Sequence, residues 1–223
     1  MMKIKTLIAL PALIASLGLL SAVRVTAQTF TILHSFTATS SSTNNDGSIP
    51  VGGLVLSGST LYGATANGGN SGVGTVFSVN TDGSGFTALH QFTAFVSPLF
   101  ANDDGAVPRA GLILSGGTLY GTAVSGGSSG NGTVFALKTN GTGFTTLHSF
   151  SAKLDYLTNS DGAYPRGLLL SGNTLYGTAS YGLLCNPSRI LFHRRAGAPF
   201  LRHRRSSTGK TQSPMLSPTH RSF

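Results

Sequence analysis

Short apolar runs alternate with glycine-rich turns along most of the chain, and the centre of the chain shows this pattern best. The runs there are bounded by Gly, Ser or Asn: Gly111 to Ser115, Thr118 to Ala123, Thr133 to Leu137 and Phe144 to Phe150. Short bounded runs of this kind predict β-strands. Gly116-Gly117 separates the first two runs and Asn140-Gly141 the last two, and both dipeptides tolerate the positive φ of a tight hairpin. The pattern therefore predicts four short antiparallel strands.

Three motifs each occur three times, at a spacing near 57 residues. One is Leu-Tyr-Gly, which starts at Leu61, Leu119 and Leu175. Another is Leu-His-x-Phe, whose histidines are His34, His90 and His148. The third is Asp-Gly followed by a proline, at Asp46, Asp104 and Asp161. Repeats of this length bury their faces by stacking, and four-stranded units arranged radially are propeller blades. The predicted fold class is all-β, with tandem repeats of about 57 residues that form four-stranded, propeller-like blades.

The linked motifs resemble the GloVer (Gloeo_Verruco) repeat of bacterial exported tandem-repeat proteins. The resemblance rests on Leu-Ser-Gly-x-x-Leu-Tyr-Gly at Leu114 to Gly121, on the glycine-rich segment with Gly-Thr-Val-Phe at Gly126 to Phe135, and on Gly-Phe-Thr-x-Leu-His-x-Phe at Gly143 to Phe150. It covers about residues 30–182. The resemblance implies a propeller-like β architecture, export, often a surface anchor at the far C-terminus, and no established catalytic activity.

Residues 1–27 have the pattern of a secretory signal peptide. Lys3 and Lys5 form a basic start, Leu7 to Leu20 is a mostly apolar run, and Val25-Thr26-Ala27 is a small-residue cleavage site. The apolar run is short for a membrane span. We expect a secreted or cell-surface protein that begins at Gln28. Because residues 28–182 contain no cysteine, the stability of the repeats must come from sheet packing.

The repeat pattern breaks after Gly182. Where the third copy should continue with Gly-Thr-Val-Phe, the chain reads Leu183-Leu184-Cys185. Residues 183–223 hold eight Lys or Arg and no acid, so this segment contributes +8 to the formal charge of +9, while residues 1–27 contribute +3 and the repeats −2. The basic character of the protein therefore belongs to the segment after the repeats.

Three interpretations of residues 183–223 remain open. A basic tail could bind nucleic acid or an anionic membrane, it could be a disordered segment, or it could result from out-of-frame translation. The simultaneous change of register, composition and cysteine use at one residue favours the last, and no specific nucleic-acid partner is expected. We thus divide the chain into a signal peptide (1–27), a partial β-propeller-like repeat region (28–182) and a basic tail (183–223) that is disordered or out of frame.

The number of predicted strands indicates an incomplete, open array. Residues 30–36 match the last strand of a repeat, two full blades follow at about 53–92 and 111–150, and the third copy offers its opening half. Propellers typically need four to eight blades, so this ring cannot close. We therefore expect a truncated member of its family with exposed blade faces, which favour self-association.

The repeated polar residues have structural interpretations beside chemical ones. We expect His34, His90 and His148 to be hydrogen-bonded within each blade, because a metal site would require them to converge. The Asn-x-Asp-Gly loops, which contain Asp46, Asp104 and Asp161, suggest either calcium ligands or side-chain-capped turns. The turns are the simpler account, since the closing glutamate of a calcium loop is missing. Tyr62, Tyr120 and Tyr176 are interpreted as packing residues rather than a sugar-binding lining.

The sequence offers little for catalysis. The chain contains no glutamate, and the only acids of the repeat region that do not recur are Asp103 and Asp155, apart from the turn residue Asp82. Glycoside hydrolysis usually needs two carboxylates at a set separation. There is no Gly-x-Ser-x-Gly elbow, and the Gly-rich stretches lie between predicted strands rather than before a helix. We therefore predict no enzyme activity, no catalytic residues, no cofactor and no metal site.

These observations predict an exported, non-catalytic tandem-repeat scaffold or interaction module of unknown ligand. The alternative is a carbohydrate-binding or carbohydrate-active propeller protein. A binding module should retain polysaccharide or cell-surface material without turnover, whereas an enzyme should release product. Surface polysaccharide, another protein or a second copy of the chain are the partners considered.

Overall fold

The computed structural model describes residues 29–152, 159, 161–181 and 190–195. The described residues form strands and no helix, so the all-β prediction is confirmed. Consequently, no helix in this part of the chain could cross a membrane. The three sheets all lie in one of the two compact units of the chain, Ile32–Phe223. The predicted signal peptide, residues 1–27, lies outside the described residues.

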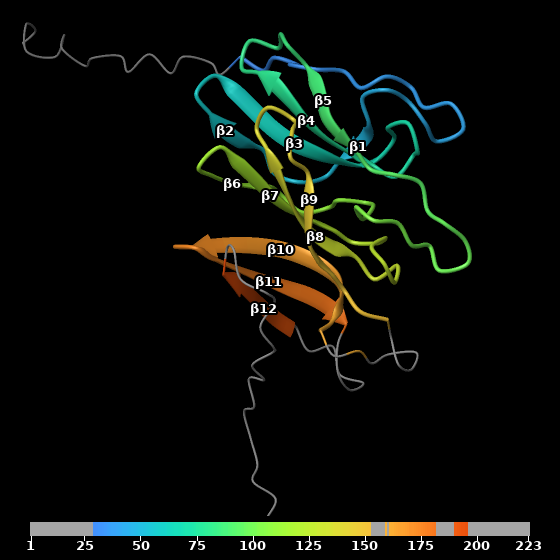
Figure 1. The fold of residues 1–223 in the computed structure, drawn as a ribbon. Helices are drawn as coiled ribbons and strands as arrows, with labels where there is room; N and C mark the ends of the chain where they lie inside the picture. The colour runs from blue at the N-terminus through green and yellow to red at the C-terminus, as the bar shows by residue number, and fades with distance from the viewer. Residues whose placement is uncertain (1–28, 153–158, 160, 182–189, 196–223) are drawn as a thin grey trace, which may run out of the picture. The chain divides into compact units, whose positions relative to one another are not determined.

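Three antiparallel sheets follow one another along the chain (Figure 1). The first contains β1 (Ser48–Pro50), β2 (Val55–Ser57), β3 (Thr60–Asn67), β4 (Thr75–Asn80) and β5 (Thr87–Gln91). The second contains β6 (Ile113–Ser115), β7 (Thr118–Ala123), β8 (Thr133–Lys138) and β9 (Thr145–Ser149). The third contains β10 (Ala163–Ser171), β11 (Thr174–Tyr181) and β12 (Ile190–Arg195). The predicted unit of four short antiparallel strands is thus present twice, as β2–β5 and β6–β9.

The strand register is the same in each sheet. In the first sheet Gly63 of β3 stands opposite Phe77 of β4, and in the second Gly121 stands opposite Phe135. The glycine leaves room for the ring on the opposite strand: a Cβ at Gly63 would lie 2.6 Å from Cζ of Phe77. Glycine normally weakens a strand interior, and here the close approach of an aromatic ring explains its presence.

The core is shared between neighbouring sheets. One cluster of buried side chains joins the first sheet to the second: Tyr62, Val76, Phe92, Leu112, Leu119, Ala123, Phe135 and Leu137. A smaller cluster joins the second sheet to the third, through Val134, Phe150 and Ala179. Each repeat therefore buries its apolar residues against the next one, as expected for stacked repeats.

Two predicted boundaries require correction. Residues 30–36, predicted as a strand, form none, because no strand among the described residues pairs with them. Conversely, β12 lies inside the segment that was predicted to be a tail without strands. It pairs with β11 in the register of β4 and β8, and Phe192 stands opposite Gly177. Ile190-Leu191-Phe192 supplies the β-forming residues that this position needs. Residues 183–189 and 196–223 lie outside the described residues.

The glycine–phenylalanine pair makes a testable prediction. Replacing Gly63 with Ala should lower the free energy of unfolding by about 1–3 kcal/mol, because the new methyl group meets the Phe77 ring in a packed site. Replacing Gly53 with Ala is the matched control, because nothing lies within 4 Å of a Cβ there. Urea unfolding of the two variants measures the difference, and an equal effect at both positions would contradict this account.

Candidate functional site: the histidine–aspartate junctions

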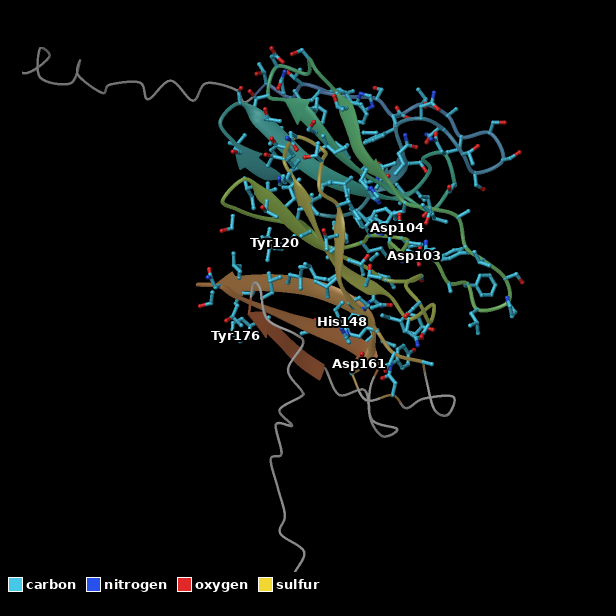
Figure 2. The ribbon with its side chains drawn as sticks, viewed as in Figure 1. Asp103, Asp104, Tyr120, His148, Asp161 and Tyr176 are labelled. Carbon is cyan, nitrogen blue, oxygen red and sulfur yellow. The ribbon has the colours of Figure 1, made fainter. Side chains whose placement is uncertain are left out.

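Each repeated histidine contacts the aspartate of the Asn-x-Asp-Gly loop that follows it. The distance from Nε2 to the aspartate Oδ2 is 3.1 Å for His34 and Asp46, 3.0 Å for His90 and Asp104, and 2.9 Å for His148 and Asp161. Figure 2 shows His148 beside Asp161, with Asp104 at the same side of its own repeat. We call each pair, with its neighbouring hydroxyl and amide residues, a junction: His34/Thr37/Asn44/Asp46, His90/Thr93/Asn102/Asp104 and His148/Ser151/Asn159/Asp161.

The aspartate of each junction accepts several hydrogen bonds from the end of the preceding repeat. In the second junction, Oδ2 of Asp104 accepts from His90 and from the backbone N–H of Thr93, at 3.0 Å each. Oδ1 accepts from the Thr93 hydroxyl at 2.6 Å. Asp46 receives the same set from His34 and Thr37. Both carboxylate oxygens are therefore occupied by protein donors.

In the first two junctions the asparagine uses all of its hydrogen-bonding capacity locally. Oδ1 of Asn102 accepts from the backbone N–H groups of Gly105 (3.0 Å) and Gly127 (2.9 Å). Its Nδ2 donates to the carbonyl oxygens of Thr93 and Gly105, at 2.8 Å each. Gly105 has a φ of +94°, which favours glycine at this turn. The side-chain-capped turn predicted for these loops is confirmed, and its amide oxygen has no capacity left for calcium.

In the first two junctions the histidine also contacts the next repeat. The His90 ring stacks on Phe144, with centroids 3.8 Å apart and an interplanar angle of 10°. It meets Phe92, from its own repeat, edge to face at 4.9 Å. His34 stacks in the same way on Phe86. The prediction of a structural histidine was correct, but its hydrogen bond joins one repeat to the loop of the next instead of staying within one blade.

Backbone contacts complete the connection between repeats. Val107 N–H donates to the Val73 carbonyl at 2.8 Å, and Tyr164 N–H donates to the Asn131 carbonyl at 2.8 Å. Val107, Tyr164 and the equivalent Ile49 each precede a proline and each have a φ of +57°. This conformation is strained for non-glycine residues and especially for β-branched ones. Its recurrence at one position in three repeats shows that the junction imposes it.

The electrostatics favour charged aspartates. Burial raises the pKa of Asp104, but the hydrogen bonds from His90 and Thr93 outweigh burial, so the pKa lies below its ordinary value. The same balance lowers the pKa of Asp161, through His148 and Ser151, and that of Asp46, through Thr37 and His34. The hydrogen bonds thus stabilise the ionised form more than burial penalises it.

The junction resembles only part of a catalytic constellation. An aspartate that orients a histidine is one half of a catalytic triad, and the triad also needs a nucleophile and an oxyanion site. The described residues contain no group of three or more His, Cys, Asp or Glu that could hold a metal ion. Asp103 is exposed, and its candidate partner Asp155 lies outside the described residues. What the geometry does provide is a rigid connection between consecutive repeats.

Sequence reasoning missed the hydroxyl residues of the junctions. Thr37, Thr93 and Ser151 bind both oxygens of their aspartates in the structure, and each follows the histidine by three residues. A hydroxyl residue directly after Leu-His-x-Phe in every copy was the available signal. Thr133 was also missed: its hydroxyl donates to the Asp104 carbonyl at 3.1 Å and fixes the loop to β8.

The repeated tyrosines lie away from the junctions. In the view of Figure 2, Tyr120 and Tyr176 lie near the opposite ends of their sheets from Asp104 and Asp161. Tyr62 is buried in the core cluster between the first and second sheets. The interpretation of this tyrosine as a packing residue is therefore correct.

Comparisons with known proteins identify the repeat. A family model described as the Gloeobacter/Verrucomicrobia repeat matches residues 15–198 and confirms the resemblance. No curated protein matches the chain. Among solved structures, the chain is similar to one in "Crystal structure of Nidogen/Laminin Complex", with a TM-score of 0.39 and 16% identity. The match covers 61% of this chain and 40% of that chain.

Removing one junction carboxylate should destabilise the protein. In Asp104→Asn, an amide NH₂ replaces one of the oxygens that accept from His90 and Thr93, which leaves buried donors unsatisfied. We expect the free energy of unfolding to fall by about 1–3 kcal/mol. Asp103→Asn is the control, because this adjacent side chain is exposed. Urea unfolding measures both, and equal stability of the two variants would disprove a structural role for Asp104.

The lowered carboxyl pKa values predict acid sensitivity. Because the folded pKa of Asp46, Asp104 and Asp161 lies below the ordinary value, the unfolded chain binds more protons than the native chain in acid. Their contribution to stability is complete above the ordinary carboxyl pKa of about 3.9 and is lost as the pH falls through the folded pKa. The urea midpoint should therefore decrease in this acidic range. Asp104→Asn should show a smaller decrease, and an unchanged pH dependence would contradict the assignment.

Proposed function

Because the chain belongs to the Gloeobacter/Verrucomicrobia repeat family, we propose that it is an exported, non-catalytic repeat scaffold that binds another macromolecule through loops between its repeats. The observation that carries this proposal is the recurrence of one saturated junction in every repeat. Residues that could perform chemistry, the histidines and aspartates, instead hold consecutive repeats together. Export is supported by the basic start and apolar run of residues 1–27.

One loop has the character of a binding element. Val96 and Ala101 form a small hairpin, in which each backbone N–H donates to the other residue's carbonyl, at 2.7 and 3.3 Å. The hairpin exposes three large apolar side chains: Val96 (67% exposed), Leu99 (64%) and Phe100 (68%). The equivalent hairpin of the first repeat joins Ser40 to Thr43 and is polar. The repeat fold therefore does not require the apolar tip.

The chemistry of this tip supports a protein partner. Clustered exposed apolar residues mark interaction sites, and aromatic anchors contribute strongly to protein interfaces. Asp103, next to the hairpin, is exposed and negative, and residues 93–105 contain no Lys or Arg. A partner with an apolar pocket and a cationic rim fits this combination. Cell-surface polysaccharide is the alternative ligand class, and Phe100 is the exposed aromatic residue that would favour it.

The hairpin gives a direct test of the proposal. In the triple variant Val96→Thr, Leu99→Ser, Phe100→Asn, the apolar tip is removed, and Asn tolerates the φ of +51° at position 100. Mature chain, Gln28–Phe223, is immobilised and tested against solubilised cell-surface proteins and purified surface polysaccharide of the producing cell. We expect the triple variant to retain about tenfold less protein than the unmodified chain, since a tenfold loss corresponds to about 1.4 kcal/mol.

The control is Ser41→Asn with Ser42→Asn in the polar hairpin, where both residues also have positive φ. This control should bind like the unmodified chain. Equal retention by the triple variant would show that the hairpin is not the binding element. Release of soluble product from the polysaccharide would contradict the non-catalytic proposal.

A further inference from the structure

The first repeat exposes apolar residues whose counterparts in the later repeats pack against the repeat before them. We call Leu54 and Leu56 the leading face; both are large, apolar and exposed. Leu54 is 54% exposed, whereas the equivalent residue of the second repeat, Leu112, is only 9% exposed. Leu56 is exposed, and its counterpart Leu114 packs against the core. The same sequence position is thus buried or exposed depending on whether a preceding repeat covers it.

The structure shows what covers the equivalent face in the second repeat. Leu112 belongs to a cluster with Tyr62, Val76 and Phe92 of the preceding repeat. We call the surface formed by these residues the trailing face of that repeat. The contact between the second and third repeats is similar, since Leu168 packs against a cluster that contains Val134 and Phe150. A leading face and a trailing face are therefore complementary surfaces.

The described part of the third repeat has counterparts of two of the three trailing-face residues. Tyr176 is the equivalent of Tyr62 in its Leu-Tyr-Gly motif. In β12, Leu191 stands opposite Thr178, the register position that Val76 holds opposite Ala64 and Val134 opposite Thr122. The first repeat thus carries a leading face, and the third repeat carries the residue types of a trailing face.

We propose that the leading face of the first repeat binds the trailing face of the third repeat in a second copy of this chain, so that chains associate head to tail. The argument is continuity with an interface that occurs twice within the chain. Residues 48–57 carry no charged side chain, which suits burial against a sheet better than binding to an anionic membrane. This inference deepens the proposed scaffold function by naming one partner, and it does not depend on the ligand of the hairpin.

Two variants remove one surface each. In the head variant, Leu54→Asp with Leu56→Asp, charges replace two leucines that are more than half exposed. In the tail variant, Tyr176→Asp, the tyrosine of the trailing face of the third repeat is replaced. Light scattering coupled to size exclusion then gives the molar mass of mature chain, Gln28–Phe223, over a range of concentrations. Circular dichroism shows whether each variant keeps its β-sheet content.

The unmodified chain should form oligomers whose mass rises with concentration, as in an open head-to-tail series. Each variant alone should be a monomer, and an equimolar mixture of the two should stop at the dimer, because only one intact pair of surfaces remains. The hairpin variant Val96→Thr, Leu99→Ser, Phe100→Asn is the control and should associate like the unmodified chain. If the tail variant loses its β-sheet content, the molar mass of the head variant still shows whether the leading face is needed for association.

Several outcomes would overturn the proposal. A monomeric unmodified chain would mean that another segment of the chain or another molecule covers the leading face, and binding of that monomer to phosphatidylcholine vesicles would identify a lipid surface. Oligomers of undiminished size in the head variant would place the interface elsewhere. A tail variant that still forms dimers on its own would indicate pairing of two leading faces, and a mixture that stays monomeric would show that a leading face does not bind a trailing face. Partner binding by the hairpin and association of chains are measured separately. A chain that associates but binds no partner contradicts only the proposed function, and a chain that binds a partner but does not associate contradicts only the head-to-tail proposal.

Discussion

The arrangement of the repeats depends on one hydrogen-bonded carboxylate at each junction, which is buried in the first two junctions and half-buried in the third. Asp104 receives hydrogen bonds from the end of the first repeat, through His90 and Thr93, while its own backbone carbonyl is held by Thr133 of the second. An ionised carboxylate in a buried site is costly unless donors satisfy it, so the segment that supplies the donors cannot move away without a large penalty. The direction in which each repeat follows the previous one is therefore fixed by a polar contact, and apolar packing fills the space around it.

The stacked aromatic rings depend on that carboxylate. The hydrogen bond to Asp104 sets the position of the His90 ring, which lies flat on Phe144, and Phe144 in turn stacks on Phe135. Phe135 occupies the space above Gly121. Polar and apolar parts of the junction thus form one connected group, in which the small glycine of one strand, a ring of the next strand and the histidine of the previous repeat fit together.

The sequence predicted this fold well where the evidence was periodic. The short apolar runs and the glycine turns between them predicted four antiparallel strands per unit, and the Leu-Tyr-Gly, Leu-His-x-Phe and Asp-Gly motifs predicted the repeat. The hydroxyl of Thr93 was not predicted, since its partner Asp104 is 11 residues away and Thr is common in strands. Two boundaries were wrong because pairing depends on a neighbour: residues 30–36 have none among the described strands, and β12 pairs with β11 through its backbone although Arg194 and Arg195 give it the composition of a tail. The role of Gly63 became visible only with the Phe77 ring opposite it.

Every junction draws its residues from two consecutive repeats and from no others. Stability in such an array is approximately the sum of the repeats and of the contacts between nearest neighbours. A gene that duplicates or deletes one unit of about 57 residues would therefore bring with it everything the new contact requires: the acceptor at one end and the donors at the other. Natural variation in this architecture can change the length of the array in whole units, whereas a partial unit would separate a carboxylate from the groups that make its burial tolerable.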